Sequence, residues 1–541
     1  MEISAGKSVL NGIAIGKIKL YKKKSDEIIR KERNDYQQEF SRFKLAKQTA
    51  MDQLKALVDK AAEEFGDENA AIFEVHMMLL DDDDFNESVE EIIRSERVNA
   101  EYAISVTCDK ICEMFSVMTD EYFRARTVDI KDISERLINI LSNNVNMEFV
   151  LDEPSIILAE ELTPSDTLQI DKNKILGIIN RLGSVNSHTA IIARALGIPA
   201  LLGVDIKDEW DGQLGIIDGS DSMLYINPDR EILSAFKEKH KEELSRKELL
   251  LKLKGKETVT PSGKRINLFA NIGSLTELET AIDNDAEGIG LFRSEFLYME
   301  SKNFPSEEEQ FKAYRKAAEA MKGKKVIIRT LDLGADKQLD YFDLGKEDNP
   351  ALGYRAIRIC LTQPDIFKTQ LRAIYRASVY GNISVMFPMI TSLEELYKIK
   401  EVISEVKKEL RDEGYLYHDV ELGIMVETPA AAVISDLLAE EVDFLSIGTN
   451  DLTQYTLAVD RQNSKLDDFC NTHHIAILRL IKTVIDNGHK KGCWVGICGE
   501  LAADLSLTEK FIEMEIDELS VSPLCILSVR ERICMADTSI I

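Results

Sequence analysis

The second half of the chain alternates between short apolar segments and segments with helical periodicity. Eight segments rich in apolar and β-branched residues follow Thr260, and helical patterns separate most of them. This alternation favours parallel strands joined by helices. Eight such units over about 280 residues predict a (β/α)8 barrel, whose active site would lie at the carboxyl ends of the strands. The segments are INLFANI, EGIGLFR, KVIIRT, ISVMFPMI, LGIMVE, FLSIGTN, WVGIC and ELSVS.

The first half contains a helical pattern followed by a mixed one. From about residue 25 to residue 142, apolar positions recur at three and four with few Gly or Pro, which predicts an antiparallel helical subdomain. From Pro154, short apolar runs separated by turn residues predict a compact α/β unit. The strand-like run GIAIGKIKLY, from Gly12, is expected to join a later sheet. After Asp229, about two dozen residues lack a helix breaker and predict a linker helix.

Polar side chains fall at or just beyond the ends of the predicted barrel strands. Arginine forks match the oxygens of phosphate and carboxylate groups, and paired carboxylates suit Mg²⁺ that also bridges a phosphorylated ligand. A single charged residue at a strand end does not indicate a binding site. Several that converge on one face favour a binding site over a purely structural role. The residues are Arg293, Arg329, Glu427, Asn450, Asp451 and Cys498.

His188 lies at the centre of the stretch GSVNSHTAIIARALGIPA, just before an apolar helical pattern that Ser187 can cap. A helix start offers unpaired backbone N–H groups and the positive end of the helix dipole, which stabilise a phosphate on the imidazole. Neutral imidazole is also a competent nucleophile. An isolated histidine at this position more often packs against the helix end, so the context has to decide between the two interpretations.

The composition is that of a globular protein with several domains. The 541 residues carry a formal charge of -28, with 44% hydrophobic and 30% charged residues. This charge repels nucleic acid and anionic membranes but attracts a basic protein partner. The N-terminus lacks a secretory signal, no apolar run could span a membrane, and the eight cysteines show no paired CxxC pattern. A cytoplasmic enzyme with reduced thiols is expected.

The segment GSVNSHTAIIARALGIPALLG resembles the phosphohistidine segment shared by enzyme I of the phosphoenolpyruvate-dependent sugar phosphotransferase system, phosphoenolpyruvate synthase and pyruvate phosphate dikinase. The resemblance implies that His188 carries phosphate. The usual pattern is Asp-x-Gly-Gly-x-Thr-Ser-His-Thr, whereas this chain has Arg181 for Asp, Ser184 for the second Gly and Asn186 for Thr. Because these departures lie beside the nucleophile, the rate of phosphorylation stays open.

Seven motifs of the barrel region closely resemble, in the same order, the phosphoenolpyruvate-binding barrel of enzyme I. With the earlier segments, the resemblance covers nearly the whole chain. Small departures, at Ser294, Ala335, Gln462 and Ala503, remove no charged ligand. The motifs are GIGLFRSEFLYM, VIIRTLDLGADK, NPALGYRAIRI, MFPMI, MVETPAA, IGTNDLTQYTLAVDR and GICGELAAD.

The resemblance also implies an order of domains in a multidomain α/β protein. Residues 1–22 and 146–229 would form the phosphohistidine α/β domain, and residues 23–145 an inserted helical subdomain. That insertion would dock the small phosphocarrier protein HPr through an acidic face near Asp81 to Asp84, with His76 on the preceding helix. Residues 230–258 would be a linker helix able to swing the histidine domain, and residues 259–541 a phosphoenolpyruvate-binding TIM barrel.

Roles for individual residues follow from the matched motifs. His188 would be the phosphohistidine nucleophile, and Cys498 the proton donor to the enolate, as a thiol near its unperturbed pKa of about 8.5. Glu427 and Asp451 would coordinate Mg²⁺. The remaining matched residues would bind or support the substrate: Arg293, Arg329, Asn450, Arg461, Arg355 and Arg358.

The resemblance implies transfer of phosphate from phosphoenolpyruvate to His188 and then to a histidine of HPr, by a homodimer formed through the barrel. Two alternatives remain. A dikinase or synthase shares the histidine segment and the barrel, but it also needs an ATP-grasp domain, and only the helical block precedes His188. The other is a regulatory paralogue with weak or no phosphotransfer, which the altered loop at Arg181, Ser184 and Asn186 motivates.

Overall fold

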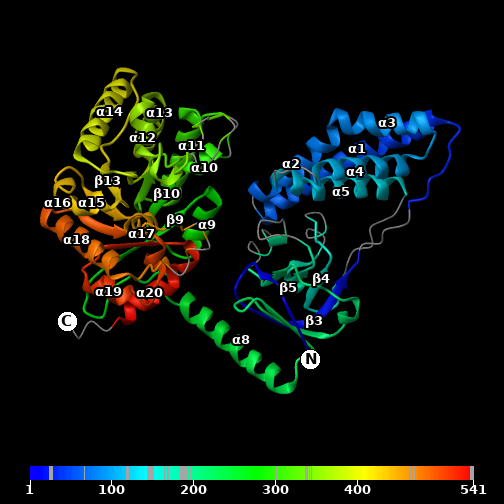
Figure 1. Cartoon of the computed structure of the whole chain (residues 1–541), viewed down its shortest axis with the longest axis horizontal. Helices are drawn as coiled ribbons and strands as arrows, with labels where there is room; N and C mark the ends of the chain where they lie inside the picture. Colours follow the sequence, from blue (N-terminus) through cyan, green and yellow to red (C-terminus); the bar gives the residue numbers. More distant parts are fainter. Residues whose placement is uncertain are drawn as a thin grey trace. The chain divides into compact units, whose positions relative to one another are not determined.

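The computed structural model divides into two compact units, residues 1–246 and 247–541. Each unit is described by itself (Figure 1). The described residues are 1–541 apart from 23–27, 66, 117–120, 143–150, 164–165, 167–169, 183–188, 191–192, 194–196, 300, 302, 335–338, 340, 343, 346, 462, 464–465, 467–468 and 537–541.

The first unit contains an eight-stranded sheet with the order β1-β8-β7-β3-β4-β5-β6-β2. Its strand β3 pairs in parallel with β4 and antiparallel with β7. The run that follows Gly12 therefore joins a sheet whose other members come much later in the chain, as the sequence predicts. The strands are β1 Glu2–Ala5, β2 Lys7–Ser8, β3 Ile13–Tyr21, β4 Ser155–Ala159, β5 Ile175–Asn180, β6 Ala200–Leu202, β7 Leu214–Asp218 and β8 Met223–Ile226.

Between β3 and β4 the chain forms a block of helices with its own apolar core. Phe43, Phe73 and Phe85 are buried in that core. Asp82 caps one of the helices, accepting a hydrogen bond from the N–H of Phe85. His76 is fully buried, with Nε2 3.1 Å from Oδ1 of Asp129. The helices are α1 Tyr36–Phe65, α2 Asp67–Asp81, α3 Asp83–Glu96, α4 Ala100–Ser116 and α5 Glu121–Leu141.

A long helix, α8 Arg230–Leu251, follows the sheet. It occupies most of the segment for which a linker helix is predicted. No helix among the described residues has the length and apolar character needed to cross a membrane.

The second unit is a closed barrel of eight strands. Each strand pairs in parallel with the next, and β16 closes the barrel by pairing in parallel with β9. The predicted (β/α)8 barrel and the multidomain α/β class are confirmed. The strands are β9 Asn267–Ile272, β10 Ile289–Arg293, β11 Val326–Arg329, β12 Ile383–Phe387, β13 Glu421–Val426, β14 Phe444–Ile447, β15 Trp494–Ile497 and β16 Glu518–Val521.

Helices such as α14 and α18 lie outside the barrel strands (Figure 1). Their apolar faces form one large core with the outer faces of the strands. The helices are α9 Leu275–Asp283, α10 Glu295–Met299, α11 Glu307–Ala320, α12 Ile357–Thr362, α13 Pro364–Ala377, α14 Leu393–Asp412, α15 Pro429–Val433, α16 Ser435–Leu438, α17 Thr449–Leu457, α18 Ile475–Lys491, α19 Thr508–Glu513 and α20 Ile526–Met535.

Arg530 of α20 fixes the segment after α8 to the barrel. Its side chain is 0% exposed, and Nη1 lies 2.6 Å from Oδ2 of Asp285. Nη1 also donates to the carbonyl oxygen of Leu253 at 3.2 Å, and Nε donates to the hydroxyl of Thr258 at 3.0 Å. One buried cation therefore joins the last helix, the segment after the long helix and the loop before β10.

Arg530→Met should lower the free energy of unfolding of the barrel by about 3 kcal/mol, because it removes the cation from a buried ion pair. The chain has two tryptophans, Trp210 and Trp494. Urea unfolding of the full chain in a Trp210→Phe background would make the fluorescence of Trp494 report on the barrel. Arg532→Met on the same helix is the control, since Arg532 is 41% exposed. An equal shift in both variants would contradict the assigned role.

Candidate active site

Arg329 stands at the end of β11 with its side chain buried, at 8% exposure. Its Nη2 lies 2.9 Å from Oε1 of Glu295, and its Nη1 lies 2.9 Å from Oδ2 of Asp332. Burial alone would lower the pKa of Arg329, but these two carboxylates raise it above its usual value. The guanidinium is therefore a fixed, fully charged cation at the carboxyl end of a barrel strand.

Asp332 joins a second arginine to this group. Nη2 of Arg355 lies 2.9 Å from Oδ1 of Asp332, and Nη1 donates to the hydroxyl of Tyr455 at 3.5 Å. Arg355 is 6% exposed. The buried Nε atoms of Arg329 and Arg355 have no hydrogen-bond partner among the described residues. Two paired guanidinium groups that each keep an unbonded N–H are suited to bind the oxygens of an anionic ligand.

Glu427 lies directly after β13 and is 1% exposed. Its Oε1 accepts a hydrogen bond of 2.6 Å from the backbone N–H of Met389. Met389 has a φ of 57°, the left-handed region that a non-glycine residue rarely adopts. Burial raises the pKa of Glu427 well above its usual value, and the charges of Asp332 and Asp451 raise it further. The site therefore holds more negative charge around Glu427 than its nearby cation, Arg329, compensates.

Asp451 lies in the first turn of α17, which follows β14, and is 8% exposed. Nη2 of Arg461 lies 3.8 Å from its Oδ1, with the arginine side chain 43% exposed. The neighbouring Asn450 makes two hydrogen bonds with Glu500, donating Nδ2 to Oε1 at 3.0 Å and accepting from the backbone N–H at 2.9 Å. The loops after β14 and β15 are thus tied together beside the carboxylates.

Cys498 lies directly after β15 and is 3% exposed. Below it, apolar side chains fill the barrel interior, among them Phe444 and Met425. Burial raises the pKa of the Cys498 thiol to about 12, and the charges of Glu518 and Glu427 act in the same direction. The unperturbed value expected from the sequence is therefore wrong, because the side chain is buried beside carboxylates. The thiol is protonated at neutral pH in either case.

The carboxylates fit a divalent cation that is also bound by a ligand. No group of three or more His, Cys, Asp or Glu side chains in the described part of the chain is arranged to hold a metal by itself. Glu427 and Asp451 nevertheless place two oxygen donors close enough for the charge of one to raise the pKa of the other. Mg²⁺ commonly binds one or two carboxylates and completes its shell with water and substrate phosphate. Glu427 and Asp451 form a pair of carboxylate donors of this kind.

The other residues singled out in the sequence lie in different surroundings. Arg293 ends β10, is exposed, and pairs in register with Arg329. Arg358 donates to the carbonyl oxygens of Leu352 and Gly353 at 3.0 and 2.7 Å, so it supports the loop before α12. Residues 183–188, which include His188, Ser184 and Asn186, lie outside the described residues. Arg181 is described, and its Nη1 lies 3.0 Å from Oε2 of Glu160.

The sequence analysis missed three residues that hold the arginines in place. Glu295 and Asp332 pair with Arg329, and Tyr455 contacts Arg355. All three lie inside the barrel motifs that were singled out. Glu295 is two residues beyond the end of β10, and Asp332 is three residues beyond the end of β11. An acidic residue close behind a strand-end arginine was the available signal.

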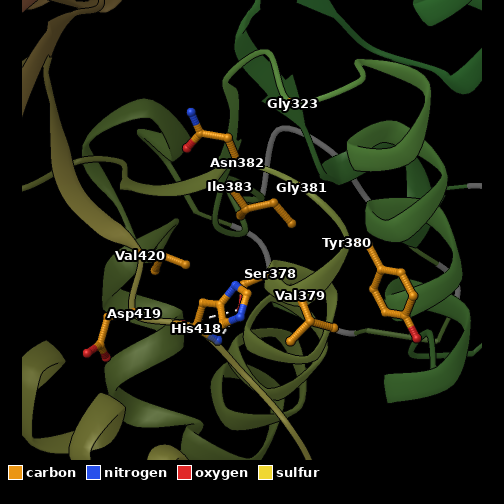
Figure 2. Close-up of a pocket in the computed structure, with 10 residues that line it drawn as sticks. All are labelled: Gly323, Ser378, Val379, Tyr380, Gly381, Asn382, Ile383, His418, Asp419 and Val420. Carbon is orange, nitrogen blue, oxygen red and sulfur yellow. Dashed lines mark hydrogen bonds between the residues drawn. The ribbon is translucent and has the colours of Figure 1, made fainter.

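A cavity of about 540 Å³ lies at the other end of the barrel (Figure 2). Ile383, which begins β12, lines it, as do residues 418–420 just before β13. Figure 2 shows Ser378 and His418 joined within it, where the backbone N–H of His418 donates to the hydroxyl at 2.8 Å. The cavity thus belongs to the amino ends of the strands and is separate from the candidate site.

A parallel barrel with buried arginines and paired carboxylates at its carboxyl rim defines a class of protein that binds anionic, phosphorylated ligands. Three family models match the chain and refine this class. They are the PEP-utilising enzyme N-terminal domain at residues 5–126, the mobile domain at residues 151–222 and the PEP-binding domain at residues 247–538. The chain belongs to the family of PEP-utilising enzymes.

Curated relatives match along nearly the whole chain. The phosphoenolpyruvate-protein phosphotransferase of Bacillus sp. (strain S) is 42% identical over 98% of this chain and 92% of its own length. That of Haemophilus influenzae is 43% identical over 96% of this chain and 92% of its own length. A solution NMR structure of an enzyme I protein is 34% identical, with a TM-score of 0.38, over 44% of this chain and 99% of its own.

Glu427→Gln should stabilise the metal-free protein at neutral pH. The raised pKa of Glu427 means that the folded state binds its proton more tightly than the unfolded state. The free energy of unfolding therefore falls as the pH rises above about 4.3, the value for an unfolded glutamate, and through the folded pKa. Glutamine does not ionise, so the variant avoids this loss of stability. Its unfolding temperature at pH 7 should therefore be about 2–4 °C higher, the shift given by roughly 1 kcal/mol.

Mg²⁺ with phosphoenolpyruvate should raise the unfolding temperature of the wild type, and the same variant should lose this stabilisation. Differential scanning fluorimetry from pH 4 to pH 8 measures both effects. Glu440→Gln serves as the control because Glu440 is an exposed partner of Lys491. A wild-type stability that stays flat with pH, or a variant that keeps the full Mg²⁺-dependent shift, would contradict the assignment.

Proposed function

We propose that the chain transfers the phosphoryl group of phosphoenolpyruvate to its own His188 and then to a histidine of the carrier HPr, releasing pyruvate. This is the first step of the sugar phosphotransferase system. The observation that carries the proposal is the pair of buried arginines, Arg329 and Arg355, which keep unbonded N–H groups beside two carboxylates at the barrel rim. The identity to relatives of that name along 98% of the chain supports it.

Phosphoenolpyruvate presents a phosphate and a carboxylate, which the arginines would bind. Arg293, Arg329 and Arg461 would hold these oxygens, with Asn450 as a further donor and Arg355 and Arg358 in support. Glu427 and Asp451 would hold Mg²⁺, which neutralises charge on the phosphate when bound. Since Glu295 and Asp332 already fix Arg329, little reorganisation is needed when the substrate binds.

In the transfer step, the imidazole of His188 attacks phosphorus in line, and the bond from phosphorus to the enol oxygen breaks. The enolate that leaves is stabilised by the arginines. The Cys498 thiol then gives its proton to the methylene carbon, which completes pyruvate. A thiol whose pKa is raised to about 12 keeps its proton until a base as strong as the enolate carbon forms beside it.

The N-terminal part would serve the second transfer. We infer a phosphohistidine α/β domain at residues 1–22 and 146–229, an HPr-docking helical subdomain at 23–145, a linker helix at 230–258 and a phosphoenolpyruvate-binding barrel at 259–541. The insertion of α1 to α5 between β3 and β4 supports these boundaries. Asp83 and Asp84 are exposed at the start of α3 and would meet basic residues of HPr. We further infer a homodimer through the barrel and a cytoplasmic location.

Labelled phosphoenolpyruvate with Mg²⁺ should label the wild type on His188, and the label should pass to HPr when HPr is added. His188→Ala should take up no label. Cys498→Ala should take up label but form pyruvate at least 100-fold more slowly, since general acid catalysis contributes about 10²–10⁴-fold. Phosphate transfer is followed on gels and pyruvate by a coupled assay. A folded wild type that binds phosphoenolpyruvate but stays unlabelled would instead favour the regulatory paralogue.

Neutralising Asp83 and Asp84, as Asp83→Asn with Asp84→Asn, should slow association with HPr by about tenfold at low salt, since opposite charges steer encounter. The association rates of the wild type and the variant should converge at high salt. Stopped-flow binding measures both. The matched control is Glu401→Gln with Asp412→Asn, two exposed acids on α14. An equal effect of the two pairs would place HPr elsewhere.

A further inference from the structure

A carboxyl group lies inside the barrel among side chains that are mostly apolar. Glu518 begins β16 and is 1% exposed. A Cβ on Gly496 of β15 would lie 1.9 Å from its Oε2, and a Cβ on Gly290 of β10 would lie 2.6 Å from its Oε1. A side chain at either position would therefore displace the carboxyl group. Two glycines on different strands therefore make the space that this carboxyl group fills.

This carboxyl group lies directly below Cys498. Gly496 lies on β15 and Cys498 directly after it, two residues further along the chain, so their side-chain positions share one face and lie about 7 Å apart. Because Oε2 of Glu518 nearly occupies the position of a Gly496 Cβ, a single hydroxyl or water can bridge the carboxyl group and the thiol. Ser446 on β14 is buried and pairs in register with Gly496, and its hydroxyl lowers the pKa of the Cys498 thiol. The thiol also donates to the carbonyl oxygen of Ile447 at 3.7 Å.

The surroundings of Glu518 favour its protonated form. Burial raises the pKa of Glu518 well above its usual value and Asp517 adds to this, while Lys325 and the nearby Ser520 hydroxyl act in the opposite direction. Oε1 of Glu518 has no hydrogen-bond partner among the described residues. The Ser520 hydroxyl donates to Oδ1 of Asn271 at 2.6 Å, so its oxygen can accept from a protonated carboxyl group.

Cys498 faces charges from several elements. Besides Glu518 below it, Glu427 after β13 raises the pKa of the thiol, and Arg329 at the end of β11 lowers it. The side chain is 3% exposed. A thiolate formed here would be buried and would have little direct access to water, so a donor inside the barrel gives it the shortest route to a proton.

We propose that Glu518 returns to Cys498 the proton that the thiol gives to the enolate in each turnover. This inference rests on the proposed function. As the C–H bond of pyruvate forms, the S–H bond of Cys498 breaks and leaves a thiolate. The O–H bond of Glu518 then breaks and a new S–H bond forms, with the Ser446 hydroxyl as the bridge. The remaining carboxylate is stabilised by Lys325. The Lys325 side chain is 19% exposed, so its ammonium group can pass a proton to the buried carboxylate and regain one from water before the next turnover.

Glu518→Gln tests this, because glutamine keeps the shape of the side chain and removes the acid. Rapid-quench measurement of pyruvate, with phosphoenolpyruvate, Mg²⁺ and an excess of HPr, separates the first turnover from later ones. The first turnover should stay within about twofold of the wild type, since Cys498 already holds its proton. Later turnovers should slow by about tenfold or more, within the range of general acid catalysis, and raising the pH should deepen the loss.

The matched control is Glu421→Gln at the same end of the barrel. Glu421 bonds Lys325 from outside the interior, and its side chain is 42% exposed. Ser446→Ala removes the bridge and should also slow the later turnovers while sparing the first. This variant tests the proposal even if Glu518→Gln does not fold. Glu518→Asp, which keeps an acid, should recover part of the later rate.

Equal losses in the first and later turnovers would assign Glu518 a structural role and overturn the proposal. Unchanged rates in both phases would overturn it as well. The proposed function fails separately, and the relay with it, if the wild type forms no pyruvate from phosphoenolpyruvate at all.

Discussion

Every strand of the barrel runs in the same direction, and this constraint places the candidate site. Parallel pairing all the way round, closed by β16 against β9, brings the carboxyl ends of eight strands to one rim. Arg329 and Cys498 are far apart in the sequence, yet the charge of the first lowers the pKa of the second. The same closure lets Asn271 of β9 donate to the carbonyl oxygen of Ser520 on the last strand at 3.0 Å and to that of Cys498, after β15, at 2.9 Å.

Ion pairs within the protein hold the arginine side chains of the rim in place. Arg329 lies between Glu295 and Asp332, and Asp332 also binds Arg355. Buried ion pairs add little stability over apolar packing, since desolvation offsets most of their attraction. Their effect is positional, because donors held by carboxylates need no reorganisation when an anion arrives. Glu427 stands apart from these pairs, and burial, together with the charges of Asp332 and Asp451, raises its pKa.

The pattern of the sequence predicted the elements better than the contacts between them. All eight barrel strands were predicted from apolar segments, and Arg329, Glu427 and Cys498 from their places at strand ends. The pairing of Arg329 with Glu295 and the bonds of Arg358 to two backbone carbonyl oxygens depend on side-chain packing that periodicity does not encode. The raised pKa of Cys498 has the same origin, because burial decides it. The role of His188 stays a prediction.

Glu518 shows how a packing constraint can determine a protonation state. In the sequence it opens the segment ELSVS and gives no sign of its surroundings; only its register opposite Gly496 shows that it points into the barrel. A neutral carboxyl group with one unsatisfied oxygen costs about 1–3 kcal/mol in such a place. An isolated ionised carboxylate costs far more and takes up a proton instead. Burial thus favours the protonated form of Glu518 over the ionised one.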